Sequence, residues 1–589
     1  MKLLTFIKTS FKEFPVLFIS NFFLFVFVGL AEMLAIFSVV PLIDVFLHPN
    51  LENISTITSK FTNVFAFLRI PVTQISFMTV FLIMMVAIAV LLISLNYLVI
   101  QTKYIVVKHL ISKTCKACFT ANWQFFTGSN SGVILNTLTR EVHVVGEAFS
   151  GFSVLLSNII RLIFYTAIPF YISWKTTLIA GGLGLFFVAP LFCLGRLNYK
   201  LGKICTSTAN KFTEIIQESF LAAKVILGFG NSLRSVRECV RTYDEHRKAV
   251  VKSQLIVFAT SKVLEPCGWV AILIAIYVSL KYFSVELAEV ATIIYAMVKI
   301  IPLVKEIASQ NNSLHGFIPS YEQIYDTINT ATRHNQKSGN IIFKRLDKDI
   351  TLQNINFSYP NREPVLRDIN LKINKGSMVA LTGKSGAGKS TLVDLLMGFY
   401  QPTNGVASVD GIPLSQYDVY SFRQRIGYVP QNIVLFNTSI RNNLMWSSDT
   451  VTQKDIEEAC KIANAHDFIM ELPEGYDAVV GDRGVRLSTG QQQRLCLARA
   501  VVRKPELLIL DEATSNLDNE SEAFIQKAIS DLVHKITIVV IAHRLSTIVQ
   551  ADWIYVLKEG VITEEGTYSE LIDRKGLFNH MVNIQSFSN

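Results

Sequence analysis

Six long apolar stretches, separated by polar ones, fill the first half of the chain. A helix needs roughly 20 mostly apolar residues to cross the hydrocarbon core of a bilayer. A very large soluble protein also buries helices, but no single core requires six uninterrupted apolar segments of this length. We therefore interpret the stretches as membrane spans, expected at about 16–42, 75–100, 146–171, 175–195, 255–281 and 286–307.

The polar segments between the spans predict their orientation. Segments 101–145 and 196–254 are long and polar, yet their patterns are helical, and the second is rich in Lys and Arg. The loop 47–74 is poorer in both residues. Because basic residues are retained on the cytoplasmic side, both termini and both long segments are expected in the cytoplasm. The residues before the first span are interpreted as a short interfacial helix rather than a cleaved signal peptide.

A few charged residues lie within the apolar stretches, among them Glu32, Arg161, Glu265 and Lys299. A charge within the membrane is costly and usually faces a cavity or a partner of opposite sign. Two interpretations stay open for these residues, substrate contact or gating on one side and a structural ion pair or a snorkelling side chain on the other. Lys299 lies closer to the end of its span and fits the structural interpretation better.

The composition agrees with a membrane protein. Hydrophobic residues make up 50% of the chain and charged residues 17%, against about 25% in average soluble proteins. A formal net charge of +9 would suggest nucleic-acid binding in a soluble domain, but in a membrane protein it reflects basic cytoplasmic loops. We therefore expect no nucleic-acid partner. The eight cysteines are scattered and do not resemble a disulfide framework.

The second half of the chain follows a different pattern. Polar connecting stretches come after residue 308, and from about residue 345 short apolar strands alternate with helical patterns. Such alternation is typical of an α/β domain. The expected organisation is a transmembrane domain at 1–325, a linker at 326–344 and an α/β domain at 345–589.

The strongest motif of the α/β domain is GKSGAGKST at 383–391. It fits G-x-x-x-x-G-K-[ST] between a strand-like and a helix-like segment, which is the setting of a phosphate-binding loop. Its glycines let backbone N–H groups approach phosphate, Lys389 supplies a cation, and Ser390 places a hydroxyl on Mg²⁺. The residues expected to contact a nucleotide are Gly383, Lys384, Ser385, Gly386, Ala387, Gly388, Lys389, Ser390 and Thr391.

Two further strands end in residues suited to phosphate chemistry. The strand in ELLILDEATSNLD, 506–518, ends at Asp511, which can hold Mg²⁺, and Glu512, which can polarise an attacking water. The strand in ITIVVIAHRLST ends at His543. A histidine in such a place is usually structural, and it becomes a candidate for sensing the γ-phosphate only because of these neighbours.

The order of these motifs resembles that of ABC transporter ATPase domains. The phosphate loop is followed by VPQ at 429–431, LSTGQ at 487–491, LILDEATSNLD and IAHR at 541–544. The membrane half is similar to the six-helix exporter type, including QESFLAAKVILGFG at 217–230. The resemblance implies a half-transporter, in which an α-helical six-span transmembrane domain precedes an α/β P-loop NTPase domain of the ABC type.

The resemblance also implies roles for residues around ATP and Mg²⁺. Tyr359 would stack on the adenine, and Gln431 would join the network of Mg²⁺ and water. Glu512 would be the catalytic base and His543 the γ-phosphate sensor. Asp511, Ser390 and Gln431 would form the metal site.

A second set of residues is implied to act across a dimer. Ser488, Gly490 and Gln491 of the signature segment would contact the γ-phosphate held by the opposite subunit, and Asp518 would cross the interface. Thr489 departs from the family pattern, which has glycine there. A β-branched residue has less backbone freedom than glycine, so Thr489 is expected either to strain the loop or to be neutral. The loops near 127–142 and 213–228 would dock on the ATPase domains.

The first expectation for function is ATP-driven export or flipping of a lipid, glycolipid or lipid-linked oligosaccharide by alternating access. The first span is similar to bacterial flippases of such lipids. A multidrug or peptide exporter and an ATP-gated regulatory or channel-like protein stay open. The complete catalytic set favours a homodimer over a heterodimer. The expected location is a bacterial inner membrane, with the ATPase domain in the cytoplasm.

Overall fold

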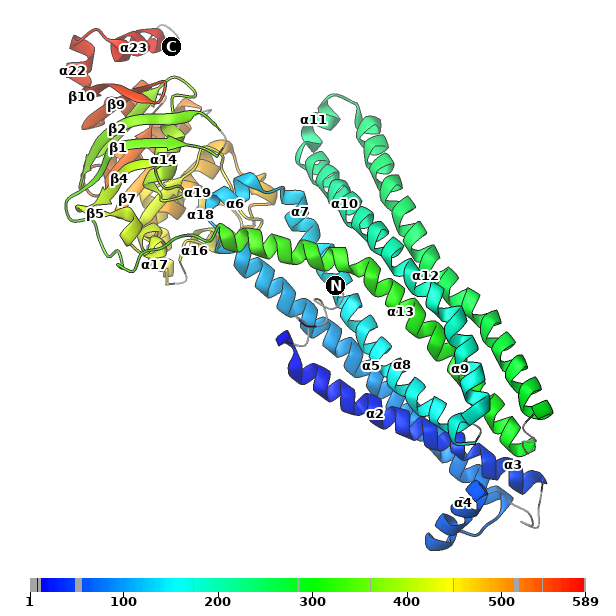
Figure 1. Cartoon of the computed structure of the whole chain (residues 1–589). Helices are drawn as coiled ribbons and strands as arrows, with labels where there is room; N and C mark the ends of the chain where they lie inside the picture. Colours follow the sequence, from blue (N-terminus) through cyan, green and yellow to red (C-terminus); the bar gives the residue numbers. More distant parts are fainter. Residues whose placement is uncertain are drawn as a thin grey trace. The chain divides into compact units, whose positions relative to one another are not determined.

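Helices much longer than a bilayer is thick form the first half of the chain (Figure 1). The computed structural model describes residues 8, 12–47, 56–172, 174–282, 287–360, 362–448, 450–512, 518–542 and 544–586. The longest helix, α12 (Ser232–Tyr282), has 51 residues and extends for about 75 Å at 1.5 Å per residue. The hydrocarbon core is only about 30 Å thick. These helices therefore continue from the membrane into water, which explains the helical patterns of the long polar segments.

The chain divides into two units, residues 1–121 with 125–335 and residues 122–124 with 336–589. The first unit is entirely helical over its described residues. Its remaining elements are α2 (Pro15–Phe37), α3 (Val39–Leu47), α4 (Thr56–Phe67), α5 (Gln74–Phe119), α6 (Trp123–Gly128), α7 (Ser131–Asn136), the π-helical turn η1 (Thr137–Glu141), α8 (Val142–Ile172), α9 (Trp174–Val188), the 3₁₀ turn η2 (Ala189–Cys193), α10 (Leu194–Leu221), α11 (Ala223–Gly228) and α13 (Leu287–Arg333).

Five helical stretches of the described residues are long and apolar enough to cross a membrane. They are Pro15–Phe46, Gln74–Phe119, Ser131–Tyr171, Thr177–Leu221 and Ser232–Val278. The sixth predicted span, 286–307, falls on the first part of α13, although residues 283–286 lie outside the described part. Most of the predicted interfacial helix before Pro15 also lies outside it. The exact span limits therefore stay predictions.

Two of the charges within the predicted spans pair with each other. Arg161 of α8 donates from Nε to Glu32 Oε2 at 2.5 Å and from Nη2 to Glu32 Oε1 at 2.6 Å. The Glu32 side chain is 7% exposed and that of Arg161 20%. A bidentate pair of this kind compensates both charges and fixes their geometry. It joins α2 to α8 and supports the structural interpretation of both residues.

The other two charges lie in less enclosed surroundings. Glu265 of α12 accepts from Lys305 of α13 at 2.7 Å, and Lys262 lies 3.9 Å from the same carboxylate. The ammonium of Lys299 lies 5.6 Å from the centre of the Tyr295 ring. Each of these charges thus has a neighbour within the helical unit.

The second unit contains a four-stranded antiparallel sheet and a six-stranded sheet. In the larger sheet, strands β9, β3, β8, β7 and β6 are parallel, and β10 pairs antiparallel with β9. The larger sheet is formed by β3 (Met378–Gly383), β6 (Ile426–Val429), β7 (Leu507–Asp511), β8 (Thr537–Ile541), β9 (Trp553–Lys558) and β10 (Val561–Gly566). The smaller one is formed by β1 (Asp349–Ser358), β2 (Pro364–Asn374), β4 (Asn404–Val409) and β5 (Ile412–Pro413).

Alternate residues along the strands of the larger sheet pack into two different hydrophobic cores. Met378 and Ala380 of β3 pack with one cluster, whereas Val379 and Leu381 pack with another that includes residues of the smaller sheet. Side chains along a strand point to opposite faces in turn, so a sheet buried on both faces is apolar throughout. The helices of this unit are α14 (Lys389–Leu396), α15 (Val419–Arg423), α16 (Ile440–Met445), α17 (Gln453–Ile462), α18 (His466–Glu471), α19 (Thr489–Val501), α20 (Asn519–Leu532), α21 (Leu545–Ile548), α22 (Tyr568–Asp573) and α23 (Leu577–Ser586), with short 3₁₀ turns η3 (Leu414–Gln416), η4 (Gly475–Asp477) and η5 (Asp482–Gly484).

The buried ion pair gives a first prediction. Glu32→Ala is expected to destabilise the helical unit by about 3–5 kcal/mol because it leaves the Arg161 guanidinium without its counter-charge. The double variant Glu32→Leu/Arg161→Met should recover most of that loss, since neither charge is then buried alone. Thermal unfolding in detergent measures both effects. Lys299→Ala serves as the control, and a double variant no more stable than Glu32→Ala would contradict the prediction.

Candidate functional site

The candidate nucleotide site lies at the edge where β3, β8 and β7 end. Leu381 of β3 pairs with Ile541 of β8, and Ile541 pairs with Asp511 of β7. Because the carboxyl ends of parallel strands meet at one edge, the loop after β3 and the acids after β7 are brought together although 122 positions separate Lys389 from Asp511. This juxtaposition is the one that the motif order predicts.

The backbone of the phosphate loop excludes side chains at two positions. Gly383 has φ +145° and Gly388 has φ +101°, conformations that residues with a Cβ rarely adopt. A Cβ at Gly383 would lie 2.2 Å from the Leu557 carbonyl oxygen, and one at Gly388 would lie 2.7 Å from Leu366 Cδ2. The glycines thus allow the loop to turn directly from β3 into the N-terminus of α14, which suits anions.

The side chain of Lys389 is fixed by hydrogen bonds to the backbone of the phosphate loop. Its Nζ donates to the carbonyl oxygens of Gly383 at 2.7 Å and Lys384 at 3.1 Å, and the residue is 6% exposed. Burial lowers the pKa of Lys389, and the carboxylates of Glu512 and Asp511 partly oppose this effect. The loop therefore holds a cation close to the place where phosphate oxygens would lie.

Two acids near the phosphate loop, the buried Asp511 and the half-buried Asp394, have raised pKa values. Burial, followed by the charge of Glu512, raises the pKa of Asp511 to about 6. Burial, followed by the charge of Asp511, raises the pKa of Asp394 in α14 to about 6. Excess negative charge of this kind suits a divalent cation. The described residues contain no group of three or more His, Cys, Asp or Glu that could hold a metal ion.

Glu512 has a strained backbone and a defined partner. Its φ is +51°, in the left-handed region that costs a non-glycine residue roughly 1–3 kcal/mol. Gln431, two residues after β6, donates from Nε2 to Glu512 Oε2 at 2.7 Å. Two residues that sequence reasoning assigned to catalysis are thus in direct contact. His543, the third, lies outside the described residues.

Tyr359 adjoins the phosphate loop through its hydroxyl. Its Oη lies 3.0 Å from Thr391 Oγ1 in α14, and its ring makes edge contacts with Phe357 and Tyr400. Burial raises the pKa of Tyr359. The side chain is thus placed beside the expected triphosphate site, where adenine stacking stays a prediction.

The signature segment forms the N-terminus of α19. The Oγ of Ser488 accepts from the Gln491 N–H at 3.2 Å, and Gln491 Oε1 accepts from the Ser488 N–H at 3.0 Å, which is a capping box. The Ser488 hydroxyl keeps its proton to donate, whereas the Gln491 amide oxygen is used in the cap. Gly490 is buried in the first turn.

Thr489 occupies the first helical position of α19 and has right-handed helical backbone. Glycine's freedom to adopt positive φ is therefore not required there. The side chain is exposed, so of the two expectations for Thr489 the structure favours neutrality over strain. Asp518 caps α20 by accepting from the Ser521 N–H at 3.0 Å, and hydrogen bonds with Ser521 lower its pKa.

Asp394 is the member of the site that sequence reasoning did not identify. It is an acid within the otherwise apolar turn TLVDLLM of α14, which is the signal that could have revealed it. The fold then places it near Asp511, a proximity that no spacing along the sequence indicates.

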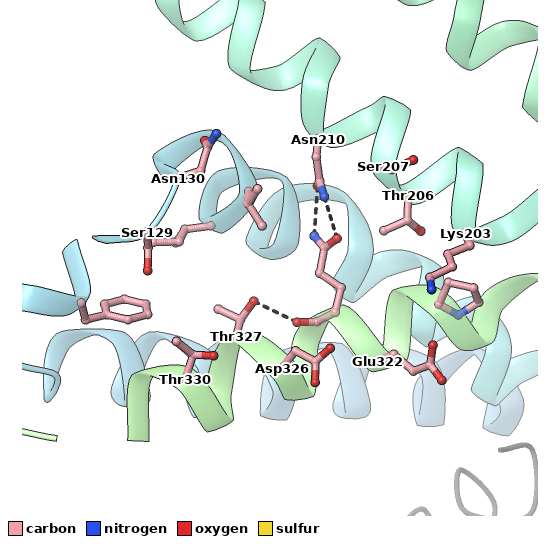
Figure 2. Close-up of a pocket in the computed structure, with 15 residues that line it drawn as sticks. Ser129, Asn130, Lys203, Thr206, Ser207, Asn210, Glu322, Asp326, Thr327 and Thr330 are labelled. Carbon is pink, nitrogen blue, oxygen red and sulfur yellow. Dashed lines mark hydrogen bonds between the residues drawn. The ribbon is translucent and has the colours of Figure 1, made fainter. Parts of the chain in front are cut away.

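A polar junction in the helical unit was also not predicted. Asn210 of α10 and Gln323 of α13 exchange two hydrogen bonds at 2.8 and 3.1 Å, and Thr327 Oγ1 donates to the Gln323 carbonyl oxygen at 2.8 Å (Figure 2). Gln323 Nε2 also donates to Thr137 Oγ1 in η1 at 2.8 Å. These bonds connect α10, α13 and η1 beside a cavity of about 410 Å³.

A buried ion pair lies in the same π-helical turn. Glu141, fully buried in η1, pairs with Arg140.

Both halves of the chain match models of one family. Residues 17–299 match the ABC transporter transmembrane region, and residues 366–515 match the ABC transporter model. The heterocyst differentiation ATP-binding protein HepA of Nostoc sp. is 35% identical over 77% of this chain and 74% of its own length. This chain belongs to the ABC transporters. It is a multi-pass membrane protein that joins the membrane region and the ATPase domain in one half-transporter of the exporter type.

Two further comparisons concern the type of ABC transporter to which the chain is similar. An ATP-dependent lipid A-core flippase of Syntrophus aciditrophicus is 33% identical over 78% of this chain and 77% of its own length. A solved structure of a bacterial Atm1-family ABC exporter with ATP bound has a TM-score of 0.83 over 97% of this chain and 99% of that chain, at 23% identity. The structural likeness shows the fold. Together with the ATPase model, the relatives indicate an ATP-hydrolysing transporter, as the motifs predict.

The buried acids predict a pH-dependent stability. Since the pKa of Asp511 lies at about 6, above the value of about 3.9 in an unfolded chain, the residue destabilises the fold in full above about pH 6, and this penalty falls as the pH drops from about 6 to about 4, below which it is absent. Asp511→Asn is therefore expected to raise the thermal midpoint at pH 7.5 in EDTA without nucleotide, with a gain that shrinks towards pH 5. Replacing the exposed Asp573 by Asn should change neither value, and an equal gain at both pH values would contradict the explanation.

The helical backbone of Thr489 gives another prediction. Thr489→Gly is expected to leave the ATPase rate within about twofold, because the helix retains its cap and the two residues differ by only a few tenths of a kcal/mol in helix propensity. The steady-state rate in nanodiscs measures this. Ser488→Ala, which removes the cap, is the matched variant and should lower the rate. A large increase for Thr489→Gly would instead show that Thr489 restrains hydrolysis.

Proposed function

We propose that two copies of this chain form a homodimer that uses ATP to move a lipid, glycolipid or lipid-linked oligosaccharide across a bacterial inner membrane. The observation that carries the ATP-driven part is the contact of Gln431 with Glu512 at the same sheet edge as the phosphate loop. The lipid substrate is supported by the similarity to the lipid A-core flippase over both halves of the chain.

The roles of the site residues are part of this proposal. ATP supplies the phosphoryl group whose transfer to water drives transport. Lys389 and the loop N–H groups hold the phosphates, and Ser390 with Asp511 would hold Mg²⁺, which neutralises the charge of the phosphates. Glu512 orients the attacking water and accepts its proton, and Gln431 positions the Glu512 carboxylate through its 2.7 Å hydrogen bond. Positioning and charge neutralisation account for most of the catalysis in phosphoryl transfer.

The dimer is proposed because a half-transporter supplies one membrane region and one ATPase domain, and because the signature segment forms a helix N-terminus. The hydrogen bonds between Ser488 and Gln491 lie within the first turn of α19, and the Asp518 carboxylate caps its own helix. The N-terminus of a 13-residue helix attracts anions. We infer that this end of α19 meets the γ-phosphate bound by the partner and that His543 completes the site.

Alternating access would couple this closure to transport. Closure of the two ATPase units around ATP moves the helices from an inward-open to an outward-open arrangement, and hydrolysis resets them. A ligand shifts such an equilibrium only by binding one state more tightly than the other. Contacts on both subunits make ATP specific for the closed state.

A flipping assay tests the proposal. Purified protein in proteoliposomes is expected to move fluorescent lipid-linked glycan or phospholipid in the presence of ATP. Glu512→Gln, which keeps the shape but removes the base, should lower both ATP hydrolysis and flipping by about 100-fold or more. Equal ATPase rates for the wild type and this variant would overturn the catalytic assignment.

The choice of transported molecule separates the alternatives. Transport of drug-like amphiphiles or peptides, without any lipid, would assign the protein to the multidrug or peptide exporters. ATP hydrolysis without transport of any of these would favour a regulatory or channel-like protein.

A further inference from the structure

A cavity of about 460 Å³ lies between α8, α9, α12 and α13, away from the nucleotide site. None of its described lining residues is charged. Of the hydroxyl groups on its wall, that of Thr166 donates to the Leu162 carbonyl oxygen of its own helix at 2.9 Å. The remaining wall is formed mainly by aliphatic and aromatic side chains. The cavity is therefore an apolar site within the predicted membrane spans.

Glycines in α9 create much of this space. A Cβ at Gly181 or at Gly184, both on the cavity wall, would meet no atom within 4 Å. Glycines in membrane helices usually allow two helices to approach closely, and Gly268 on the opposite wall does so, because a Cβ there would lie 2.7 Å from Ile301. Gly181 and Gly184 of α9 do not mediate such contact, and the space beside them belongs to the cavity.

Irregular backbone contributes to the same space. Pro169 interrupts the hydrogen bonding of α8 and lines the cavity, and such a proline kinks a helix. At its end α9 changes into the 3₁₀ turn η2, whose Phe192 also lines the cavity. The helices therefore separate here for identifiable reasons in the sequence.

Charged residues stand next in sequence to wall residues at one end of the cavity. Leu264 and Val304 line the wall, and their chain neighbours Glu265 and Lys305 form the 2.7 Å ion pair. Lys262 lies 3.9 Å from the same Glu265 carboxylate, and Glu306, the neighbour of the wall residue Ile307, follows Lys305 in α13. The ion pair lies on the side of α12 that continues into the basic segment predicted to be cytoplasmic.

We propose that this cavity binds an acyl chain of a phospholipid from the surrounding bilayer, with the phosphate near Lys262 and Lys305. An apolar cavity offers water no partners, whereas hydrocarbon chains surround the helices of a membrane protein. Its volume lies within the roughly 300–1,000 Å³ range of ligand pockets. The apolar wall and the two lysines near one end match the two chemically different parts of a phospholipid. This inference does not depend on the identity of the transported substrate.

Photolabelling of the full-length protein tests the inference. The probe is a phosphatidylglycerol that carries a diazirine in the middle of one acyl chain, incorporated into nanodiscs. The label is expected on wall residues of α12 and α13 such as Cys267 and Met297. Gly184→Leu fills the cavity and should reduce that labelling by about tenfold, because it displaces methylene groups from their apolar contacts.

Gly182→Leu is the matched control. Gly182 lies in the same turn of α9, and a Cβ there also meets no atom within 4 Å, yet it does not line the cavity, so labelling should equal that of the wild type. Gly181→Leu serves as the second cavity variant if Gly184→Leu does not fold, as judged by its thermal midpoint. Undiminished labelling in a folded cavity variant overturns the proposal. So does an absence of label on the wall in the wild type, whether a second copy covers the cavity or it stays empty. The flipping assay is unaffected by either result.

Discussion

The parallel pairing of β3, β8 and β7 is the constraint on which the nucleotide site depends. It aligns Leu381, Ile541 and Asp511 at one level of the sheet, so that a glycine-rich loop and a pair of acids meet where three strands end. In the absence of ligand the carboxylates of Asp511, at the end of β7, and Asp394, in α14, are unfavourably placed, since burial raises the pKa of both to about 6. The sheet, buried on both faces, holds Asp511 there nonetheless. The fold thus maintains excess negative charge that a divalent cation offsets.

Sequence reasoning predicted that several of these residues lie together because the candidates for phosphate binding belong to short, ordered motifs. Lys389, Asp511, Glu512 and Gln431 meet as the motif order indicates. The proximity of Asp394 to Asp511 could not be predicted, because it depends on how α14 packs against the sheet. The effect of Thr489 was also open from sequence alone, since glycine's freedom to adopt positive φ matters only if the backbone needs it there, and the structure shows helical backbone.

In the membrane half, hydropathy predicted where helices cross but not how they contact one another. Glu32 and Arg161 stood out as costly charges, yet 129 positions separate them, and only the packing of α2 on α8 reveals the bidentate pair. The same holds for the cavity beside α9, because the sequence GGLGL is equally compatible with tight helix packing. Composition shows that glycine is present, whereas the surrounding atoms decide whether it closes a space or opens one.

The π-helical turn η1 bears on the direction in which Arg161 points, and so on its ion pair with Glu32, although about 20 residues separate the turn from Arg161. Residues 131–171 run as one continuous helical stretch through Thr137–Glu141, and a π turn contains one residue more than an α turn. Each residue rotates an α-helix by about 100°. Removing one residue from the turn would therefore rotate all of α8 relative to α7 and direct Arg161 away from Glu32. The angular register of an intramembrane charge is thus set by a single additional residue some 20 positions before it.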